Sequence, residues 1–341
     1  MTNYQELLKT KEYEFLWTDP HLGKNILFLC LGGSHSYGTN IETSDVDIRG
    51  VALNSEKDLL GVTHFEQRED KATDTVIYSL NKFIELVSNC NPNVIEMLFC
   101  RPDHYIYMTP LGELILKNRH LFLTNRAYYT FSGYARAQLN RLENALSRDE
   151  HAMTPQEIEE HIARSVENCY QNCVEKLHFN RDQMSLHVGK DNEGNPELQV
   201  NVNLKDFPLR DFRIILSETT NVVADYKNCE VGNRNHKKDD LHLNKHMMHL
   251  IRLFLMGNEI LKDGDLHTYR EKEHDLLMGI RNGKYRTENG GISEDFYNLL
   301  NSLTEQMEEL KATTKLPRSV DKDKVYDLIV KPIYKQTLFK D

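Results

Sequence analysis

One run of apolar residues, ending in glycine, constrains the fold most strongly. Residues 25–32 read NILFLCLG. Its apolar side chains are continuous instead of alternating, which is typical of a strand buried on both faces of a sheet. Gly32, Gly33 and Ser34 follow the run. Glycine lets a backbone approach a ligand closely and a serine hydroxyl bonds phosphate oxygens, so we expect these three residues to form a phosphate-binding turn.

Two aspartates follow this turn at a short distance. The sequence SDVD begins eleven residues after Gly33 and contains Asp45 and Asp47. Residues i and i+2 of a strand share a face, so we expect the two carboxylates to lie side by side. Neighbouring carboxylates repel unless a cation lies between them, and hard oxygen ligands suit Mg²⁺ or Mn²⁺. Either feature alone is ordinary, but a phosphate-binding turn beside such a metal site indicates phosphoryl or nucleotidyl transfer.

The segment 31–51, LGGSHSYGTNIETSDVDIRGV, resembles the signature of the DNA polymerase beta-like nucleotidyltransferase superfamily. That signature is a hydrophobic strand, Gly-Gly/Ser and then Asp-hydrophobic-Asp. More narrowly, the chain resembles the predicted nucleotidyltransferases associated with RNA repair. It shares their motifs G-S-x-x-Y-G-T, S-D-x-D-x-R-G, L-x-K-F at 80–83, N-P-x-x-x-E-x-L at 91–98, and a later match at 245–253. The resemblance therefore reaches both halves of the chain, although 185–203 has no counterpart.

The resemblance implies a third carboxylate on a neighbouring strand, which completes the metal site and takes the proton of the nucleophile. We expect this residue to be Asp74, because it lies near the start of the β-branched segment 73–80. Glu69 and Asp70 are rivals in a polar segment. The expected catalytic and metal-binding residues are thus Asp45, Asp47 and Asp74, and a one-metal or degenerate site is the alternative.

The predicted helix 241–262 carries a basic stripe. Lys245, His249 and Arg252 fall at i, i+4 and i+7 on a helix that is otherwise apolar around most of its circumference. Cations on a largely buried helix need anionic partners, and a nucleoside triphosphate (NTP) would supply them. The alternative is a solvated face or internal salt bridges to acidic residues.

Several further positions are relevant to the same site. Tyr134 and Gln138 lie one turn apart and are expected either in the cleft or, for Tyr134, in the core. Arg270 and Arg281 flank an amphipathic helix and are expected on the surface. Arg49 should point away from both aspartates by strand alternation, as part of a structural ion pair.

The order of elements predicts an α/β (α+β) fold. Strand signals dominate early and helical periodicity dominates later, so we expect a catalytic domain with a mixed sheet at 1–125 and a mostly helical domain at 126–341. The active cleft is expected between them. The turn residues 191–195 predict a hairpin insertion near 185–204.

Composition limits the partners. The net charge of −10 argues against a sequence-independent coat on nucleic acid. No apolar run approaches the roughly 20 residues of a membrane span, and the N-terminus lacks a signal-peptide core, so we expect no membrane partner and a cytoplasmic protein.

Together these features predict a metal-dependent enzyme of the nucleotidyltransferase class (EC 2.7.7 type). It would move a nucleoside monophosphate from an NTP, such as ATP, to an acceptor hydroxyl and release pyrophosphate, with Gly33 and Ser34 on the β- and γ-phosphates. The resemblance implies an RNA end, such as a damaged tRNA, as acceptor. The alternatives are transfer of AMP to a protein or small-molecule hydroxyl, and a non-catalytic nucleotide- or RNA-binding protein.

Overall fold

The computed structural model describes residues 4–146, 155–177, 181–190, 196–230, 240–288 and 290–338. The chain divides into two compact units, 1–143 with 239–341 and, inserted between these segments, 144–238. The chain passes from one unit to the other after residues 143 and 238, whereas the sequence predicted a single boundary after residue 125. Residues after 125 belong to the same unit as the sheet because they bond to segments that flank its strands: Thr130 Oγ1 donates to the carbonyl of Cys90 at 2.8 Å, and the Arg270 amide donates to the carbonyl of Tyr37 at 3.0 Å.

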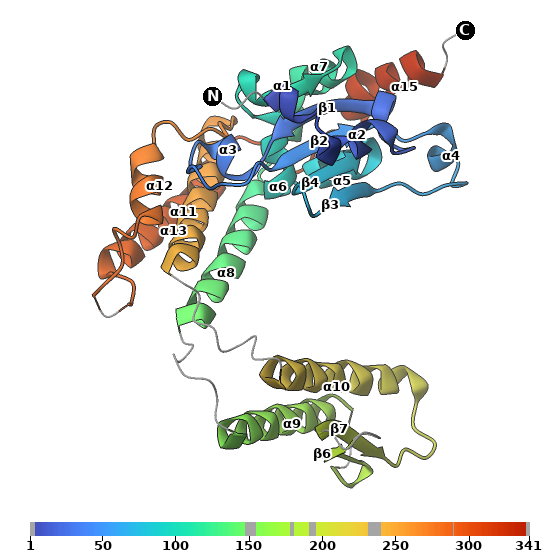
Figure 1. Ribbon diagram of the computed structural model, residues 1–341, viewed down its shortest axis with the longest axis vertical. Helices are drawn as coiled ribbons and strands as arrows, with labels where there is room; N and C mark the ends of the chain where they lie inside the picture. The colour runs from blue at the N-terminus through green and yellow to red at the C-terminus, as the bar shows by residue number, and fades with distance from the viewer. Residues whose placement is uncertain are drawn as a thin grey trace. The chain divides into compact units, whose positions relative to one another are not determined.

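The first unit contains a five-stranded mixed sheet with the order β3-β4-β2-β1-β5 (Figure 1). Strands β2 and β4 are parallel, whereas the other neighbouring strands are antiparallel. The mixed sheet followed by helices confirms the predicted fold class. The strands are β1 (Ile26–Leu31), β2 (Ile48–Ala52), β3 (Gln67–Asp70), β4 (Thr75–Ser79) and β5 (Tyr105–Met108).

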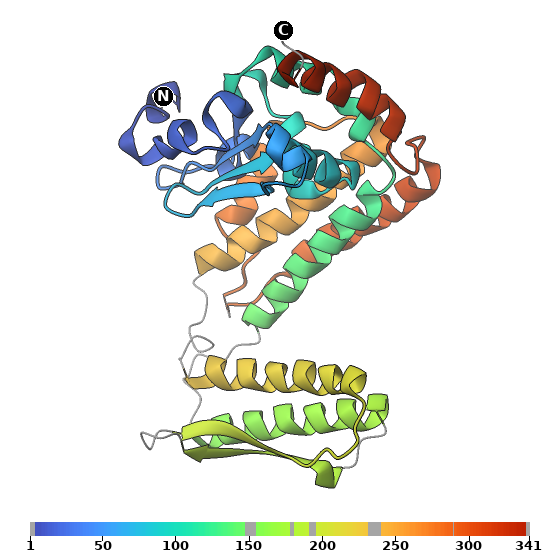
Figure 2. The same cartoon turned by 90° about the vertical axis from the view of Figure 1, so that its right-hand side faces the viewer.

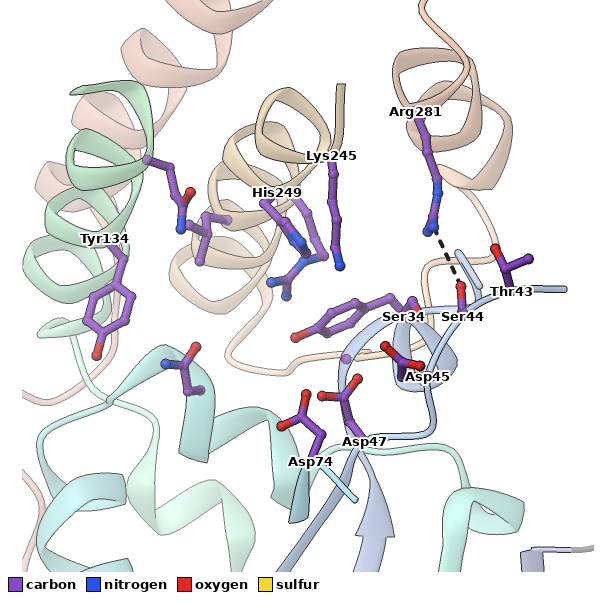
Figure 3. A pocket seen from close by; sticks show the side chains of 16 residues that line it. Ser34, Thr43, Ser44, Asp45, Asp47, Asp74, Tyr134, Lys245, His249 and Arg281 are labelled. Carbon is purple, nitrogen blue, oxygen red and sulfur yellow. Dashed lines mark hydrogen bonds between the residues drawn. The ribbon is translucent and has the colours of Figure 1, made fainter. Parts of the chain in front are cut away.

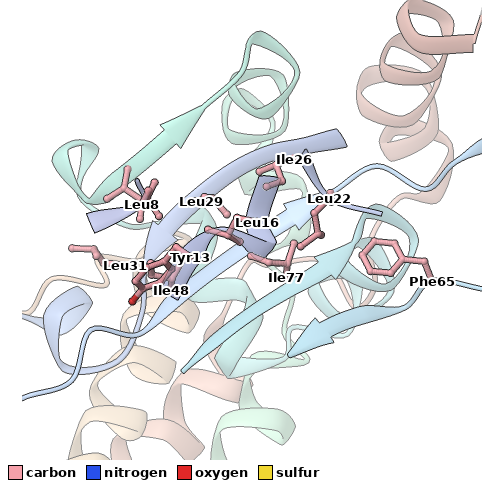
Figure 4. Close-up of a cluster of buried hydrophobic side chains, with 12 residues drawn as sticks. Leu8, Tyr13, Leu16, Leu22, Ile26, Leu29, Leu31, Ile48, Phe65 and Ile77 are labelled. Carbon is pink, nitrogen blue, oxygen red and sulfur yellow. The ribbon is translucent and has the colours of Figure 1, made fainter. Parts of the chain in front are cut away.

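Strand β1 is buried along its whole length, as its continuous apolar run predicts. Leu29 packs in a cluster with Leu16 from the N-terminal segment and Ile77 from β4 (Figure 4). Phe28 contacts Phe83 of α5 (Leu80–Ser88) with their ring centroids 6.0 Å apart. Coverage of both faces of the sheet removes this strand from water and fixes its register against β2.

The long helices of the first unit are α8 (Ala127–Leu146), α11 (Asp240–Asp263) and α13 (Glu294–Thr313). Among the helices that the structure describes, none is both long and apolar enough to cross a membrane. The shorter helices are α1 (Tyr4–Leu7), α2 (Phe15–Thr18), α3 (Gly33–Tyr37), α4 (Glu56–Leu59), α6 (Pro92–Ile95), α7 (Pro110–Lys117), α12 (His274–Arg281), α14 (Lys322–Val325) and α15 (Lys331–Leu338).

In the described residues of the second unit, two α-helices and a hairpin are the main elements (Figures 1 and 2). Helices α9 (Pro155–Leu177) and α10 (Leu209–Glu230) pack together, and strands β6 (Met184–Lys190) and β7 (Pro196–Val202) pair antiparallel. Cys173, Met184 and Ile215 belong to its buried core. The hairpin lies where the sequence predicts one, and its turn residues 191–195 are outside the described residues.

Candidate active site

Two aspartates meet at one end of the sheet. Strands β2 and β4 are parallel with Ile48 opposite Thr75, and an aspartate directly precedes each of these residues. Asp47 and Asp74 therefore lie side by side (Figure 3). Asp74 adopts φ +46°, a left-handed conformation that aspartate tolerates better than most residues. Parallel pairing thus brings together two carboxylates from distant parts of the chain.

The Gly32–Gly33–Ser34 turn lies against the same aspartate. Because β1 runs antiparallel to β2, the residues after Leu31 come beside Asp47, and the Gly32 amide donates to the carbonyl of Asp47 at 2.8 Å. Gly33 adopts φ +53°, and a Cβ atom there would lie 1.9 Å from Oδ2 of Asp47. Only glycine permits this approach without displacing the carboxylate.

A pocket of about 350 Å³ opens above the two aspartates. It contains every residue expected at the site except Gly32. Acidic side chains lie on its floor, and basic side chains of α11 and α12 lie opposite them (Figure 3). The lining residues, which we call the candidate pocket, are Gly33, Ser34, Tyr37, Thr43, Ser44, Asp45, Asp47, Asp74, Asn93, Tyr134, Gln138, Lys245, His249, Arg252, Leu253 and Arg281.

The proton affinity of Asp47 is altered by its surroundings. Burial raises the pKa of its carboxyl to about 6, together with a hydrogen bond to Asp74 and the repulsion of that second carboxylate. The charges of Arg49 and Lys245 act in the opposite direction. A carboxylate that is repelled by a neighbouring carboxylate is suited to share a cation with it.

Arg49 corrects an expectation from strand alternation. Its side chain does not point away: Nη2 lies 3.2 Å from Oδ1 of Asp47 and 3.4 Å from Oδ1 of Asp74. The long side chain turns back over the strand end, where Nη1 also donates to the carbonyls of Ile48 and Asp74. Arg49 is thus in an ion pair, as expected, but its partners are Asp47 and Asp74.

Lys245 and His249 face these carboxylates from α11. Lys245 is exposed and makes no salt bridge within the described part of the chain. Burial and the neighbouring positive charges of Arg252 and Lys245 hold the pKa of His249 well below its usual value. Of these two side chains, only Lys245 therefore carries a positive charge into the pocket at neutral pH.

Arg252 is less available to bind a phosphate than its position in the basic stripe implies. Its side chain is buried, its Nη1 lies 3.3 Å from Oε2 of Glu96, and its guanidinium stacks 3.6 Å above the ring of Tyr37. The Tyr37 hydroxyl donates to Oε1 of the same glutamate at 2.7 Å. The Nε atom of Arg252 has no hydrogen-bond partner among the described residues. The guanidinium thus lines the pocket while an internal partner balances its charge.

The expected surface positions of Arg281 and Arg270 are wrong. Arg281 lines the pocket, where Nη1 donates to the carbonyl of Thr39 and Nη2 lies 3.5 Å from Oγ of Ser44; partial burial lowers its pKa. Arg270 is buried and pairs with Glu259 and Glu273. Helical periodicity does not distinguish these arginines from solvated ones, because the partners come from other elements.

Uncharged polar side chains line another part of the pocket. Tyr134 is 38% exposed and is therefore not a core residue. Gln138 lies one turn further along α8, and its Oε1 is 3.1 Å from Nδ1 of His246. Asn93 of α6, which the sequence analysis did not single out, lines the pocket with them.

The five-stranded mixed sheet and the helices that follow it are consistent with a polymerase beta-like domain. Residues 4–164, a little under half of the chain, match the RNA repair pathway DNA polymerase beta family. The matched range contains the whole five-stranded sheet together with Asp45, Asp47 and Asp74. The match confirms the resemblance drawn from the sequence motifs.

One curated relative also matches part of the chain. It is a protein of Enterobacteria phage T4 described as an uncharacterized 38.9 kDa protein in the nrdC-mobD intergenic region. The two sequences are 27% identical over 123 residues, which cover 32% of this chain and 36% of the phage protein. No solved structure matches the chain significantly.

Proposed function

We propose that this protein is a divalent metal-dependent nucleotidyltransferase that moves a nucleoside monophosphate from an NTP to a hydroxyl at an RNA end, with release of pyrophosphate. The observation that carries the proposal is the pairing of Asp47 with Asp74 beside the Gly33–Ser34 turn. The match to an RNA repair family supports RNA as the acceptor.

The donor atoms suit a hard divalent cation. No three His, Cys, Asp or Glu side chains in the described residues are placed to hold a metal ion by themselves. Mg²⁺ commonly binds one or two carboxylates and completes its coordination with water and substrate phosphates, which fits the Asp47–Asp74 pair. Bound there, with Asp45 nearby, Mg²⁺ or Mn²⁺ would offset the negative charge that develops on the transferred phosphate.

The other side chains of the pocket bind the phosphates and accept the proton. Ser34, Lys245 and Arg281 hold the β- and γ-phosphates, and His249 and Arg252 complete the wall opposite the carboxylates. The acceptor oxygen forms a bond to the α-phosphorus while the bond from that phosphorus to the pyrophosphate oxygen breaks. The carboxylate of Asp74 accepts the hydroxyl proton, since this carboxylate lies beside Asp47 at the pocket floor.

A labelling experiment tests the proposal. The protein is incubated with each α-³²P-labelled NTP, Mg²⁺ and total RNA, and we expect label in RNA. Asp47→Asn and Asp74→Asn should each lower the rate about a thousandfold or more, because charge is lost while shape is kept.

The matched control is Glu69→Gln, since Glu69 lies on the neighbouring strand β3 outside the pocket and should be dispensable. Undiminished transfer in both aspartate variants would refute the proposed site. Label in protein or in a small molecule, with none in RNA, would refute RNA as the acceptor.

A further inference from the structure

The pocket has an uncharged end formed by Asn93, Tyr134 and Gln138. We propose that this end binds the terminal nucleoside of the acceptor RNA and positions its hydroxyl at Asp74. The inference rests on the proposed function, and it assigns acceptor binding to three residues that no comparison assigns.

The two ends of the pocket differ in charge. Tyr134 and Arg281 lie at opposite sides, with Asp47 and Asp74 between them (Figure 3). Ser44 is on the Arg281 side, where its Oγ contacts the guanidinium, whereas Asp74 is the aspartate nearer to Tyr134. The guanidinium of Arg281 and the hydroxyl of Ser44 therefore lie at one end of the pocket, and the aromatic ring of Tyr134 lies at the other.

The geometry of phosphoryl transfer indicates which substrate binds at each end of the pocket. The attacking and leaving oxygens lie roughly in line through the phosphorus. If the pyrophosphate leaves toward Ser34, Ser44 and Arg281, where its charge is balanced, the acceptor hydroxyl must approach from the opposite side. That side is the uncharged end, next to Asp74.

The uncharged end has the groups that a nucleoside needs. The Tyr134 ring is partly exposed, and its hydroxyl accepts a hydrogen bond from Nδ2 of Asn91 at 3.2 Å, which restrains the side chain. The side-chain amide of Asn93 and Nε2 of Gln138 have no hydrogen-bond partner among the described residues. Single-stranded RNA is recognised by stacking of bases on aromatic rings and by polar contacts to base edges and 2′-hydroxyls.

Binding measurements with two ligands test the assignment. Fluorescence anisotropy with a short, 5′-labelled single-stranded RNA reports acceptor binding, and calorimetry with ATP, GTP, CTP or UTP and Mg²⁺ reports donor binding. Tyr134→Ala should raise the Kd for RNA about tenfold, because one stacked base loses its platform, and should change NTP affinity less than twofold. Tyr134→Phe should keep most of the RNA affinity.

The matched control is Tyr129→Ala, since Tyr129 is 62% exposed on the same helix but lies outside the candidate pocket. An RNA with an abasic 3′-terminal nucleotide adds a direct test of contact. It should bind the parent protein about as weakly as intact RNA binds Tyr134→Ala, and Tyr134→Ala should not distinguish the two RNAs.

The outcomes separate this inference from the proposed function. Weaker NTP binding with unchanged RNA binding would assign this end to the donor base and overturn the inference. Unchanged binding of both ligands would overturn it as well. Failure of the proposed function would appear as absence of label transfer by the parent protein, whatever the binding measurements show.

Discussion

A Cβ atom on Gly33 would lie 1.9 Å from Oδ2 of Asp47, so the Gly33–Ser34 segment and the carboxylate pair are in direct contact. Substitution at this glycine must therefore move the carboxylate or the turn. These two groups of residues are separate motifs in the sequence, and in the fold they line one pocket.

This contact gives a steric prediction. Gly33→Ala should lower nucleotidyl transfer at least a hundredfold, because Asp47 is displaced by the new methyl group. Gly61→Ala is the matched control: Gly61 also has a positive φ, +73°, but a Cβ atom there meets nothing within 4 Å. Both variants carry the same kind of backbone strain. An equal effect of the two substitutions on transfer would show that strain, and not the contact with Asp47, is responsible.

Asp47 should make folding stability depend on pH. Burial in the folded protein raises the pKa of its carboxyl from the ordinary 3.8 to about 6. The folded state therefore binds this proton more tightly, and the resulting stability is present below about pH 3.8 and is lost as the pH rises through about 6. Asp47→Asn should raise the Tm by a few degrees at pH 7.5 without divalent cations, and the difference should shrink toward pH 4.5.

Asp103→Asn is the control for this measurement. A hydrogen bond from Arg101, against a small effect of burial, lowers the pKa of Asp103, which gives the opposite sign. Removal of the Asp103 carboxylate in the Asp103→Asn variant should therefore not raise the Tm at pH 7.5. A difference between Asp47→Asn and the parent that stays constant from pH 4.5 to pH 7.5 would contradict the titration of Asp47.

We expect Arg252 to contribute to the free energy of unfolding. Arg252→Ala leaves the buried carboxylate of Glu96 without its cation, a change that typically costs about 3–5 kcal/mol. We expect a Tm several degrees lower, and we expect the double variant with Glu96→Gln to recover part of the loss. Thermal unfolding measures both. An unchanged Tm together with a KM for NTP raised about tenfold would instead identify Arg252 as a direct phosphate ligand.

We expect Lys245 to contribute to NTP binding and not to the stability of the fold. It is exposed and makes no salt bridge among the described residues, so Lys245→Ala should leave the Tm within about 1 °C. The KM for NTP should rise about tenfold at low salt and less at 0.5 M salt, where charges are screened. Lys262→Ala on the same helix, outside the candidate pocket, should change neither value. An unaltered KM for Lys245→Ala would remove Lys245 from the triphosphate site.

The local sequence of residues 25–51 was enough to predict the buried strand β1 and several residues of the pocket at its end. A continuous apolar run specifies a strand covered on both faces, and β1 is such a strand. The spacing of Gly33, Asp45 and Asp47 predicts a turn and carboxylates at one end of that strand, and these residues line one pocket. Hydrophobic periodicity also predicted the helix 241–262, which corresponds to α11, because a buried helix face repeats with the helical period.

Only the tertiary structure decided which distant residues join them. Parallel register between β2 and β4 brings Asp74 to Asp47, and packing of α8 and α12 brings Tyr134 and Arg281 into the pocket. It also decided that Arg252 is paired with Glu96. The physical reason is that strand order and the partner of a charge depend on contacts between elements, whereas local periodicity records only which face of each element is apolar.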